Sequence, residues 1–475
     1  MASMPSGLRL RIHLIGICGT GMGSLAGLLR AAGHDVRGSD ESVYPPMSTM
    51  LAERGIPVLQ GYRAEHLADR PDLVVVGNVA SRSNPEAVAA ADLGLRYLSM
   101  PQAIHELFIE GRHSIVVTGT HGKTTTSALM AWVLEASGRN PTFLVGGVLT
   151  NFNRSFALGT GEDFVVEGDE YETSYFDKGP KFMHYAPRTA ILTSVEFDHA
   201  EMFRDLDAIK EAFRGLVRLV PEGGRLIYCA DDPNVREVVG IGCRGASESY
   251  GTAGNAHWKG TLRSIDAGGM TTDVERAGRP FTTLRSTLVG EQNLLNILAV
   301  TAAAAGRGLD AEAIGRGVAS FAGVRRRQEV RGEARGVVVI DDFAHHPTAV
   351  RLTLDGLRRR YDGRRLWAIF EPRTNTSRRS VFQEDYAASF DAADRILVAA
   401  VDHPERAPEG QRFSAERLVE DLRARGLAAD YQPQIKGIVE VVTREARPGD
   451  VLVVMSNGSF GGIHGRLLEA LAAAG

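Results

Sequence analysis

The stretch Ser114–Thr126, with the sequence SIVVTGTHGKTTT, constrains the fold more than any other part of the chain. Its apolar start predicts a buried strand, its glycines a tight turn, and the residues from Lys123 a helix that ends at Gly138. Free backbone N–H groups at a helix start bind phosphate, and a Lys-Thr pair there reaches terminal phosphates and Mg²⁺. The standard phosphate-loop pattern is G-x-x-x-x-G-K-[ST], but residue 117, where that pattern has its first Gly, is Val, so the motif here is a shorter form. A tight glycine turn with a solvated lysine is therefore the alternative interpretation.

Composition excludes several other classes of protein. A chain of 475 residues with a net charge of −4 predicts two to four domains and no nucleic-acid partner. The 3 cysteines are widely spaced, which argues against a disulfide framework and favours a reducing compartment. No apolar run approaches the roughly 18 residues that span a bilayer, so we expect a cytoplasmic protein without membrane contact.

Alternating strand and helix patterns divide the chain into segments 1–112, 113–328 and 329–475. Such alternation predicts parallel sheets covered by helices on both faces. A Gly- and Thr-rich stretch around residues 245–290 predicts a β-rich appendage on the central segment. The expected fold class is therefore α/β, with a Rossmann-like N-terminal domain, a central P-loop ATPase-type domain and a doubly wound C-terminal domain.

Gly16–Met22 follows the first predicted strand and opens a helix, and Asp40 ends the second strand. The spacing G-x-x-G-x-G differs from the dinucleotide pattern G-x-G-x-x-G. These residues are compatible with NAD, with another phosphate-bearing ligand such as a UDP-sugar, or with a purely structural turn.

Polar residues also follow strands of the central segment. Glu167 and His199 lie at or just past two predicted strand ends, where a carboxylate and an imidazole can hold magnesium near the phosphate loop. Alone, His199 is more typical of a hydrogen-bonded packing residue. Asn293 and Asn296 share one face of a helix, either as helix-start polar residues or for recognition of adenine.

The third segment carries a dense group of titratable residues in Asp341–Thr348, directly after an apolar strand. Two carboxylates and two imidazoles in so few residues favour a functional site over packing. Glu371–Arg378 and Met455–His464 follow two other strands of this segment. Their arginine, amide and hydroxyl side chains suit a carboxylate-bearing substrate, although the glycine-rich Met455–His464 is also compatible with a connecting turn.

Taken together, these motifs resemble the Mur ligases, ATP-dependent enzymes that form amide bonds in peptidoglycan synthesis. The resemblance covers nearly the whole chain and rests on the order and spacing of the following stretches: Gly16–Met22, Gly119–Thr126, Glu167 with its acidic run, 196–199, Gly290–Asn296, 325–329 and Asp341–Thr348.

The resemblance implies ATP and Mg²⁺ as cofactors and assigns roles to individual residues. ATP-binding residues would be Thr118, Gly119, Thr120, His121, Gly122, Lys123, Thr124, Thr125, Asn293, Asn296, Arg327, Asp341 and Asp342. Magnesium would be held by Thr124, Glu167 and His199. The catalytic residues would be Lys123, His199, Arg327, Asp342, His345 and His346. A UDP-sugar would be bound by Gly16, Gly19, Thr20, Gly21, Met22, Ser39, Asp40 and Asn78, and a peptide by Arg373, Asn375, Thr376, Ser456 and Asn457.

Three details indicate the branch of the family that adds a tripeptide, L-Ala-γ-D-Glu-meso-diaminopimelate, to UDP-N-acetylmuramate in peptidoglycan recycling. They are Cys18 within Gly16–Met22, the Tyr-Pro-Pro insertion at 44–46, and Glu371–Thr376 in place of F-x-P-H-R-Y-x-R-T. The resemblance implies an acyl-phosphate intermediate, small-molecule partners only, and a monomer or weak homodimer. The alternatives are the L-alanine-adding ligase, a nicotinamide-dependent oxidoreductase built on Gly16–Met22, and a non-catalytic nucleotide switch.

Overall fold

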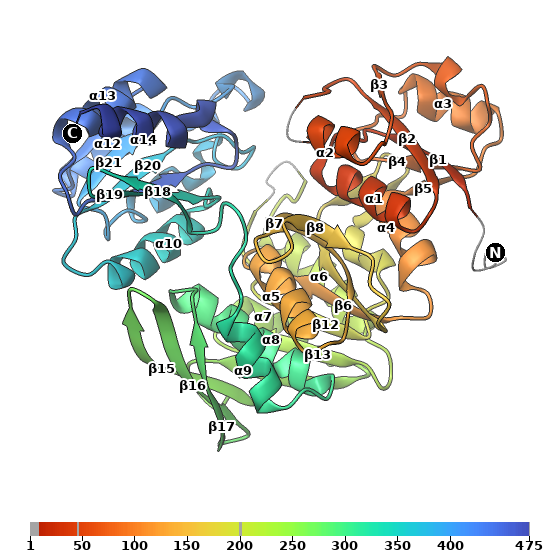
Figure 1. The fold of residues 1–475 in the computed structure, drawn as a ribbon, viewed down its shortest axis with the longest axis horizontal. Helices are drawn as coiled ribbons and strands as arrows, with labels where there is room; N and C mark the ends of the chain where they lie inside the picture. The colour runs from red at the N-terminus through yellow and green to blue at the C-terminus, as the bar shows by residue number, and fades with distance from the viewer. Residues whose placement is uncertain (1–8, 45–46, 199–201, 475) are drawn as a thin grey trace.

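A computed structural model describes residues 9–44, 47–198 and 202–474. His199 and the two prolines at 45–46 lie outside the described residues. Three mixed helix-and-sheet bodies form the molecule, with the first and third above the central one on opposite sides (Figure 1). The predicted α/β class with three such units is confirmed.

The first sheet is fully parallel, with the order β3-β2-β1-β4-β5. Strand order reverses between β1 and β4, so the loops after these two strands leave from the same point of the sheet edge, where ligands bind in open α/β sheets. The elements are β1 (Arg11–Ile15), α1 (Thr20–Ala31), β2 (Asp35–Asp40), α2 (Met47–Glu53), β3 (Val58–Gln60), β4 (Leu73–Val76), α3 (Pro85–Asp92), β5 (Tyr97–Ser99) and α4 (Met100–Ile104).

The central sheet has ten strands in the order β17-β16-β15-β14-β13-β12-β6-β9-β7-β8. Its strands are β6 (His113–Thr118), β7 (Thr142–Leu149), β8 (Arg154–Ala157), β9 (Asp163–Gly168), β12 (Thr189–Leu192), β13 (Arg225–Cys229), β14 (Ala246–Gly251), β15 (Trp258–Asp266), β16 (Gly269–Arg276) and β17 (Arg279–Ser286). Its helices are α5 (Lys123–Ala136), α6 (Leu206–Leu219), α7 (Pro233–Val239), α8 (Glu291–Gly306) and α9 (Ala311–Ala319).

The β-rich stretch that the sequence places beside this body continues the sheet itself. β14 pairs in parallel with β13 and with β15, and β15 to β17 then form an antiparallel meander. Helix α5 is buried on nearly all sides because it lies against the sheet and against α8 and α9. This explains its apolar composition and fixes the phosphate loop that precedes it.

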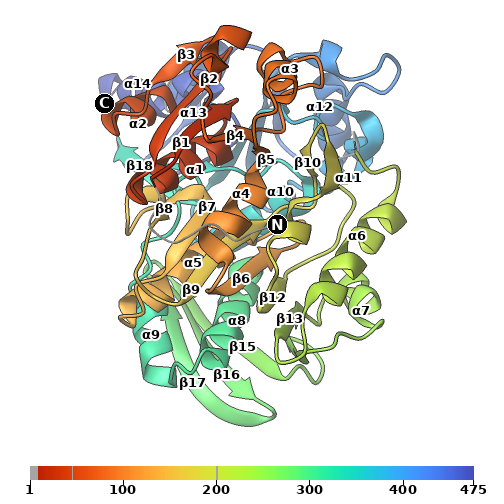
Figure 2. The same cartoon turned by 90° about the vertical axis from the view of Figure 1, so that its right-hand side faces the viewer.

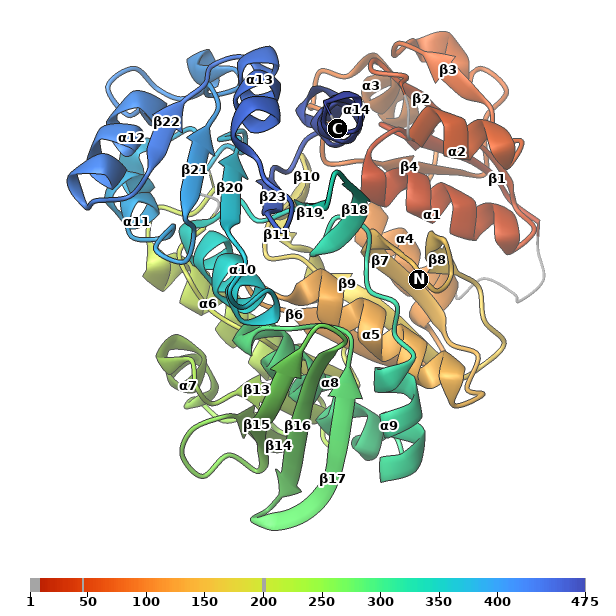
Figure 3. The ribbon, with the colours of Figure 1, turned by 60° about the vertical axis from the view of Figure 1, so that its left-hand side comes forward.

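The third sheet has the order β18-β19-β23-β20-β21-β22, and only its edge strand β18 is antiparallel. The strands are β18 (Glu329–Ala334), β19 (Val337–Asp342), β20 (Leu366–Phe370), β21 (Arg395–Val398), β22 (Ala429–Tyr431) and β23 (Val451–Met455). The helices are α10 (Pro347–Arg360), α11 (Gln383–Ala387), α12 (Ala415–Ala424), α13 (Ile435–Glu445) and α14 (Ile463–Ala473). Helix α10 lies between this sheet and the central body and contacts α8 and β15 (Figure 3).

Two of the contacts that hold the first body on the central one involve α1 and the β10–β11 hairpin. Helix α1 lies on β8, where a Cβ at Gly27 would lie 2.0 Å from an atom of the Phe156 ring, and the Arg54 guanidinium lies over the same ring, 4.8 Å from its centroid. The hairpin of β10 (Glu172–Ser174) and β11 (Asp177–Pro180) lies near β5 of the first body (Figure 2). There Phe176 meets Tyr97 edge to face, with the ring centroids 5.3 Å apart. Among the helices described, none combines the length and apolar character needed to cross a membrane.

Candidate active site

One large cavity, of about 1580 Å³, is lined by the carboxyl-end loops of all three sheets. Gly16 and Asn78 come from the first body, the loop from Thr120 to Thr125 from the central body, and Asp342 and Asn457 from the third. Parallel strands direct their carboxyl-end loops to one edge, which is why segments so distant in sequence share one cavity.

The phosphate loop is shaped by two glycines with positive φ, Gly119 at 125° and Gly122 at 83°. A Cβ at Gly119 would lie 2.1 Å from the Thr193 hydroxyl oxygen, and one at Gly122 would lie 2.6 Å from Asn296 Oδ1. Only glycine fits either position. Thr120 to Thr125 line the cavity, whereas Thr118 is buried beneath them and donates to the Ile191 carbonyl at 3.0 Å.

Lys123 is the buried cation of this loop. Its Nζ lies 2.9 Å from Glu170 Oε2 and 2.6 Å from the Gly119 carbonyl oxygen. Burial favours the neutral amine, but the carboxylates of Glu170 and Asp169 outweigh it and raise the pKa of Lys123. The ammonium is therefore charged and already positioned at the helix start.

Oxygen donors for a hard cation lie beside this lysine. The Thr124 hydroxyl donates to Glu167 Oε1 at 2.7 Å, and Gly146 N donates to Glu167 Oε2 at 2.6 Å. Burial and the neighbouring Asp169 raise the pKa of Glu167. A divalent cation here would relieve that buried carboxylate, and hydroxyl and carboxylate oxygens are the ligands that Mg²⁺ prefers. The residues therefore fit the metal that the sequence predicts.

The segment between the central and third bodies brings Arg327 to the phosphate loop. Its Nη2 lies 3.5 Å from the Thr124 hydroxyl, and its guanidinium stacks on Phe343 at 4.8 Å. Both neighbours of Arg327 adopt left-handed backbone, Arg326 with a φ of 62° and Gln328 with a φ of 51°. Asp342 supports this bend, because its carboxylate accepts from the Gln328 N–H at 2.8 Å. The orientation of Arg327 is thus set by the backbone before any ligand binds.

Other predicted nucleotide contacts are also near the loop. Asn296 accepts a hydrogen bond from Thr126 at 3.0 Å and donates to Asn293 Oδ1 at 3.2 Å, and both asparagines line the cavity. Neither caps the helix, because the N-cap residue is Gly290. Asp341 lines the cavity as well, but its carboxylate faces Arg331 and His464, at 3.5 and 3.4 Å.

In the first body, the predicted sugar-site residues divide into two groups. Those on the cavity wall are Gly16, Gly19, Thr20, Gly21, Met22 and Asn78. Ser39 and Asp40 lie behind the wall: Asp40 accepts from the Cys18 N–H at 2.9 Å, and the Ser39 hydroxyl donates to buried Glu86. The geometry gives these two residues a role in holding the glycine turn.

The predicted peptide-binding residues also divide into residues on the cavity wall and residues away from it. Arg373 and Asn457 line the cavity, whereas Asn375 is exposed away from it. Thr376 is buried and donates to Asp198 at 2.6 Å, and the buried Ser456 hydroxyl donates to Glu371.

Two histidines of the third body reach the cavity in different states. His345 is held through Nδ1 by the Phe343 carbonyl oxygen at 3.0 Å, so its Nε2 carries the lone pair. Burial lowers the pKa of His345, which keeps the ring neutral. His346 instead faces His121 and Glu196 of the central body.

Sequence reasoning missed four residues of the site: Asp169, Glu170, Arg326 and Phe343. Asp169 and Glu170 follow Glu167 in a strand-end acidic run, which was a usable signal. Arg326 donates to the carbonyls of Ser456 and Gly458 at 2.6 Å, and no pattern in the sequence indicates that contact.

The fold and the cavity together define a class of protein. Residues 11–112 match the family model described as Mur ligase family, catalytic domain; residues 117–304 match Mur ligase middle domain; and residues 326–458 match Mur ligase, glutamate ligase domain. The chain belongs to the Mur ligase family, enzymes that use ATP to form a C–N bond.

Sequence identity to individual relatives distinguishes between kinds of Mur ligase. The chain is 43% identical over 466 residues to UDP-N-acetylmuramate–L-alanyl-γ-D-glutamyl-meso-2,6-diaminoheptandioate ligase of Escherichia coli, covering 98% of both chains. It matches the crystal structure of a murein peptide ligase from Psychrobacter arcticus with a TM-score of 0.71 and 38% identity, over 98% of this chain and 99% of that one. Identity to UDP-N-acetylmuramate–L-alanine ligase of Acetivibrio thermocellus is lower, 32% over 450 residues, covering 94% of this chain and 93% of that relative.

Proposed function

We propose that this enzyme joins UDP-N-acetylmuramate to the tripeptide L-Ala-γ-D-Glu-meso-diaminopimelate through an acyl phosphate, as a step of peptidoglycan recycling. The observation that carries the proposal is the 43% identity, over 98% of both chains, to an E. coli enzyme named for that peptide. The L-alanine-adding reaction is the second candidate, supported by the weaker 32% identity.

The cavity suits this chemistry because it admits three reactants from three bodies. The glycine turn of the first body would bind the UDP-sugar, the phosphate loop would bind ATP, and Arg373 and Asn457 of the third body would meet the peptide. Lys123 and Arg327 would neutralise charge on the transferred phosphoryl group, since catalysis of this transfer is mainly positioning and electrostatic stabilisation. Thr124 and Glu167 would hold Mg²⁺, which supplies further charge neutralisation. The predicted role of His199 in metal binding stays a prediction.

Attack on an acyl phosphate needs a neutral amine and therefore a proton acceptor. His345 is better placed for this role than His346, because its Nε2 lone pair is free to face the cavity while His346 is engaged with Glu196. The predicted cytoplasmic location and the monomeric or weakly dimeric state also stay predictions.

The proposal is tested by supplying UDP-N-acetylmuramate and ATP with either the tripeptide or L-alanine, and measuring phosphate release and the amide product. We expect release that depends on the tripeptide and little release with L-alanine. Equal or greater turnover with L-alanine contradicts the peptide assignment, and phosphate release with no amide product contradicts ligation itself.

A further inference from the structure

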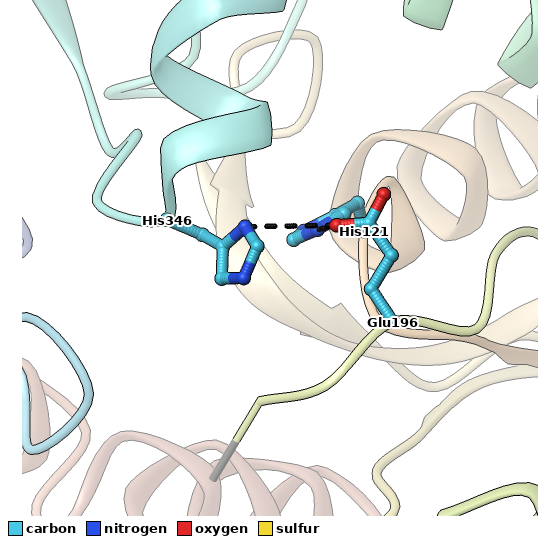
Figure 4. Close-up of side chains that lie close together, drawn as sticks. All are labelled: His121, Glu196 and His346. Atoms are coloured by element: carbon cyan, nitrogen blue, oxygen red, sulfur yellow. Dashed lines mark hydrogen bonds and ion pairs between the residues drawn. The ribbon is translucent and has the colours of Figure 1, made fainter. Parts of the chain in front are cut away.

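Three side chains from three separate elements converge at the junction of the central and third bodies (Figure 4). His121 belongs to the phosphate loop, Glu196 follows β12, and His346 is the N-cap residue of α10. His121 Nε2 lies 3.1 Å and His346 Nδ1 lies 3.7 Å from the same oxygen, Glu196 Oε2. One donor atom from each residue lies within 4.8 Å of the other two.

The hydrogen bonds of His346 present one ring nitrogen to this cluster as a lone pair. Its Nε2 donates to the Phe197 carbonyl oxygen at 3.2 Å, so its Nδ1 is unprotonated and lies 3.7 Å from Glu196. This Nδ1 accepts the cap hydrogen bond of α10 from the Thr348 N–H at 3.3 Å, which a bound metal ion would replace. A backbone carbonyl that holds the second nitrogen of a histidine is the usual support for a metal-ligating imidazole.

Glu196 supplies the single negative charge of the cluster. Its Oε2 accepts hydrogen bonds from His121 Nε2 at 3.1 Å and from the Thr348 hydroxyl at 2.8 Å. These bonds hold the carboxylate between the two rings. His121 and His346 both line the large cavity, which gives an ion and a coordinating water access from solvent.

We propose that His121, Glu196 and His346 bind a first-row transition-metal dication, such as Zn²⁺, that ties the third body to the phosphate loop. Two imidazoles and one carboxylate suit zinc, cobalt or nickel, whereas Mg²⁺ prefers an all-oxygen set. Metal–nitrogen bonds of about 2.0–2.1 Å place tetrahedral ligands roughly 3.3 Å apart, whereas the three donors here lie within 4.8 Å of one another, so they must converge on binding. His121 Nε2 must also lose the proton that it donates to Glu196, because a ligating imidazole nitrogen is unprotonated. The site shares no residue with the proposed Mg²⁺ ligands Thr124 and Glu167.

The test is equilibrium dialysis of the full-length enzyme with Zn²⁺ in the absence of ATP and Mg²⁺. We expect about one bound equivalent in the parent and at least tenfold weaker binding in His346→Asn. Asparagine keeps an acceptor for the helix start, so this variant retains the α10 cap. The matched control is His403→Ala, which removes an exposed histidine that pairs with Glu405 at 2.9 Å but has no third ligand within the described residues.

Two outcomes overturn the site. Zinc binding that is unchanged in His346→Asn shows that the metal lies elsewhere, and binding that falls in Glu167→Gln but not in His346→Asn places it at the Thr124–Glu167 pair. Co²⁺ gives an independent readout, because intense visible absorption marks a low-coordinate nitrogen-and-oxygen site in the parent, and we expect its loss in His346→Asn.

A second measurement tests whether the metal ties the two bodies together. Small-angle X-ray scattering of the ATP-free parent should show a smaller radius of gyration with Zn²⁺ than without it, and no such change in His346→Asn. If zinc binds through His346 but the radius of gyration does not change, the metal site stands, but the proposal that the metal links the two bodies is wrong.

Discussion

At the scale of single residues, the phosphate loop depends on a buried ion pair. Lys123 and Glu170 have side chains that are 12% and 3% exposed, and their charged atoms lie 2.9 Å apart. Removing one partner of a buried pair leaves an uncompensated charge, which costs about 3–5 kcal/mol, whereas removing both costs much less. Stability and catalysis at Lys123 can therefore be separated.

We expect Lys123→Met to lower the thermal unfolding midpoint and to abolish amide formation. The double variant Lys123→Met/Glu170→Gln should recover most of the midpoint, because no charge is left unpaired, yet remain inactive. Differential scanning fluorimetry and a phosphate-release assay check both points. Near-normal turnover in either variant contradicts the role of Lys123 in binding phosphate.

His113, at the start of β6, makes stability depend on pH. Burial and the nearby Arg307 lower its pKa to about 4 from an ordinary 6.5, so the folded state opposes its protonation. The unfolded chain binds that proton more readily, so stability is complete above pH 6.5 and falls as the pH drops toward 4.

We therefore expect His113→Gln, which cannot be protonated, to lose less stability than the parent between pH 7 and pH 5. Glutamine keeps a hydrogen-bonding group for Thr189, which lies 2.8 Å from the histidine Nε2. Unfolding midpoints at the two pH values measure the difference, and His403→Gln at the surface is the control. An equal loss in parent and His113→Gln would show that other groups govern the acid response.

At the scale of elements, the sequence predicted several of the buried strands that carry site residues at their ends. Strands β20 and β23 end at Phe370 and Met455, where the sequence predicted that strands precede Glu371–Arg378 and Met455–His464. A run of apolar residues between turn signals has few alternatives to a buried strand. The pairing of β14 with β13 was not predictable, since the partner of an edge strand depends on tertiary contacts. For the same reason, the sequence predicted that Asp40 and Ser456 contact ligands, whereas the structure places both side chains behind the wall of the cavity.

The packing of α1 on β8 gives a prediction about the first body. A methyl group at Gly27 would overlap the Phe156 ring, and overpacking of this kind costs about 1–3 kcal/mol. We expect Gly27→Ala to raise the KM for the UDP-sugar, whose predicted site lies at the start of α1, with little effect on the KM for ATP. Gly27→Ala/Phe156→Leu should recover the parental value, and no recovery would show that the ring is not the cause.

At the scale of the whole molecule, the connection between the central and third bodies is very short. Arg325 N donates to the Val148 carbonyl oxygen at 2.9 Å, which fixes it to the central body. Arg326 instead binds the Ser456 and Gly458 carbonyl oxygens of the third body. We infer that the two bodies pivot between residues 325 and 326, three residues before the boundary of 328 that the sequence suggested.

Inserting one glycine between Arg325 and Arg326 should therefore uncouple Arg327 from the phosphate loop. We expect turnover to fall by about 10²–10³-fold, the usual cost of a lost transition-state charge contact, while ATP affinity changes little. Single-turnover kinetics and nucleotide titration separate the two effects. A glycine inserted after Gly410, in a surface turn, is the control, and equal losses in both insertions would argue against a pivot at this point.

The Lys123–Glu170 pair also affects which anions can bind the phosphate loop. An incoming anion competes with an internal carboxylate that already satisfies the ammonium. Orthophosphate or sulfate would make too few contacts to compensate for the lost Lys123–Glu170 ion pair. A triphosphate would add contacts to the loop amides, Thr124 and Arg327. We therefore expect small anions to bind the loop weakly, because Glu170 competes with them for Lys123 without needing to touch the nucleotide.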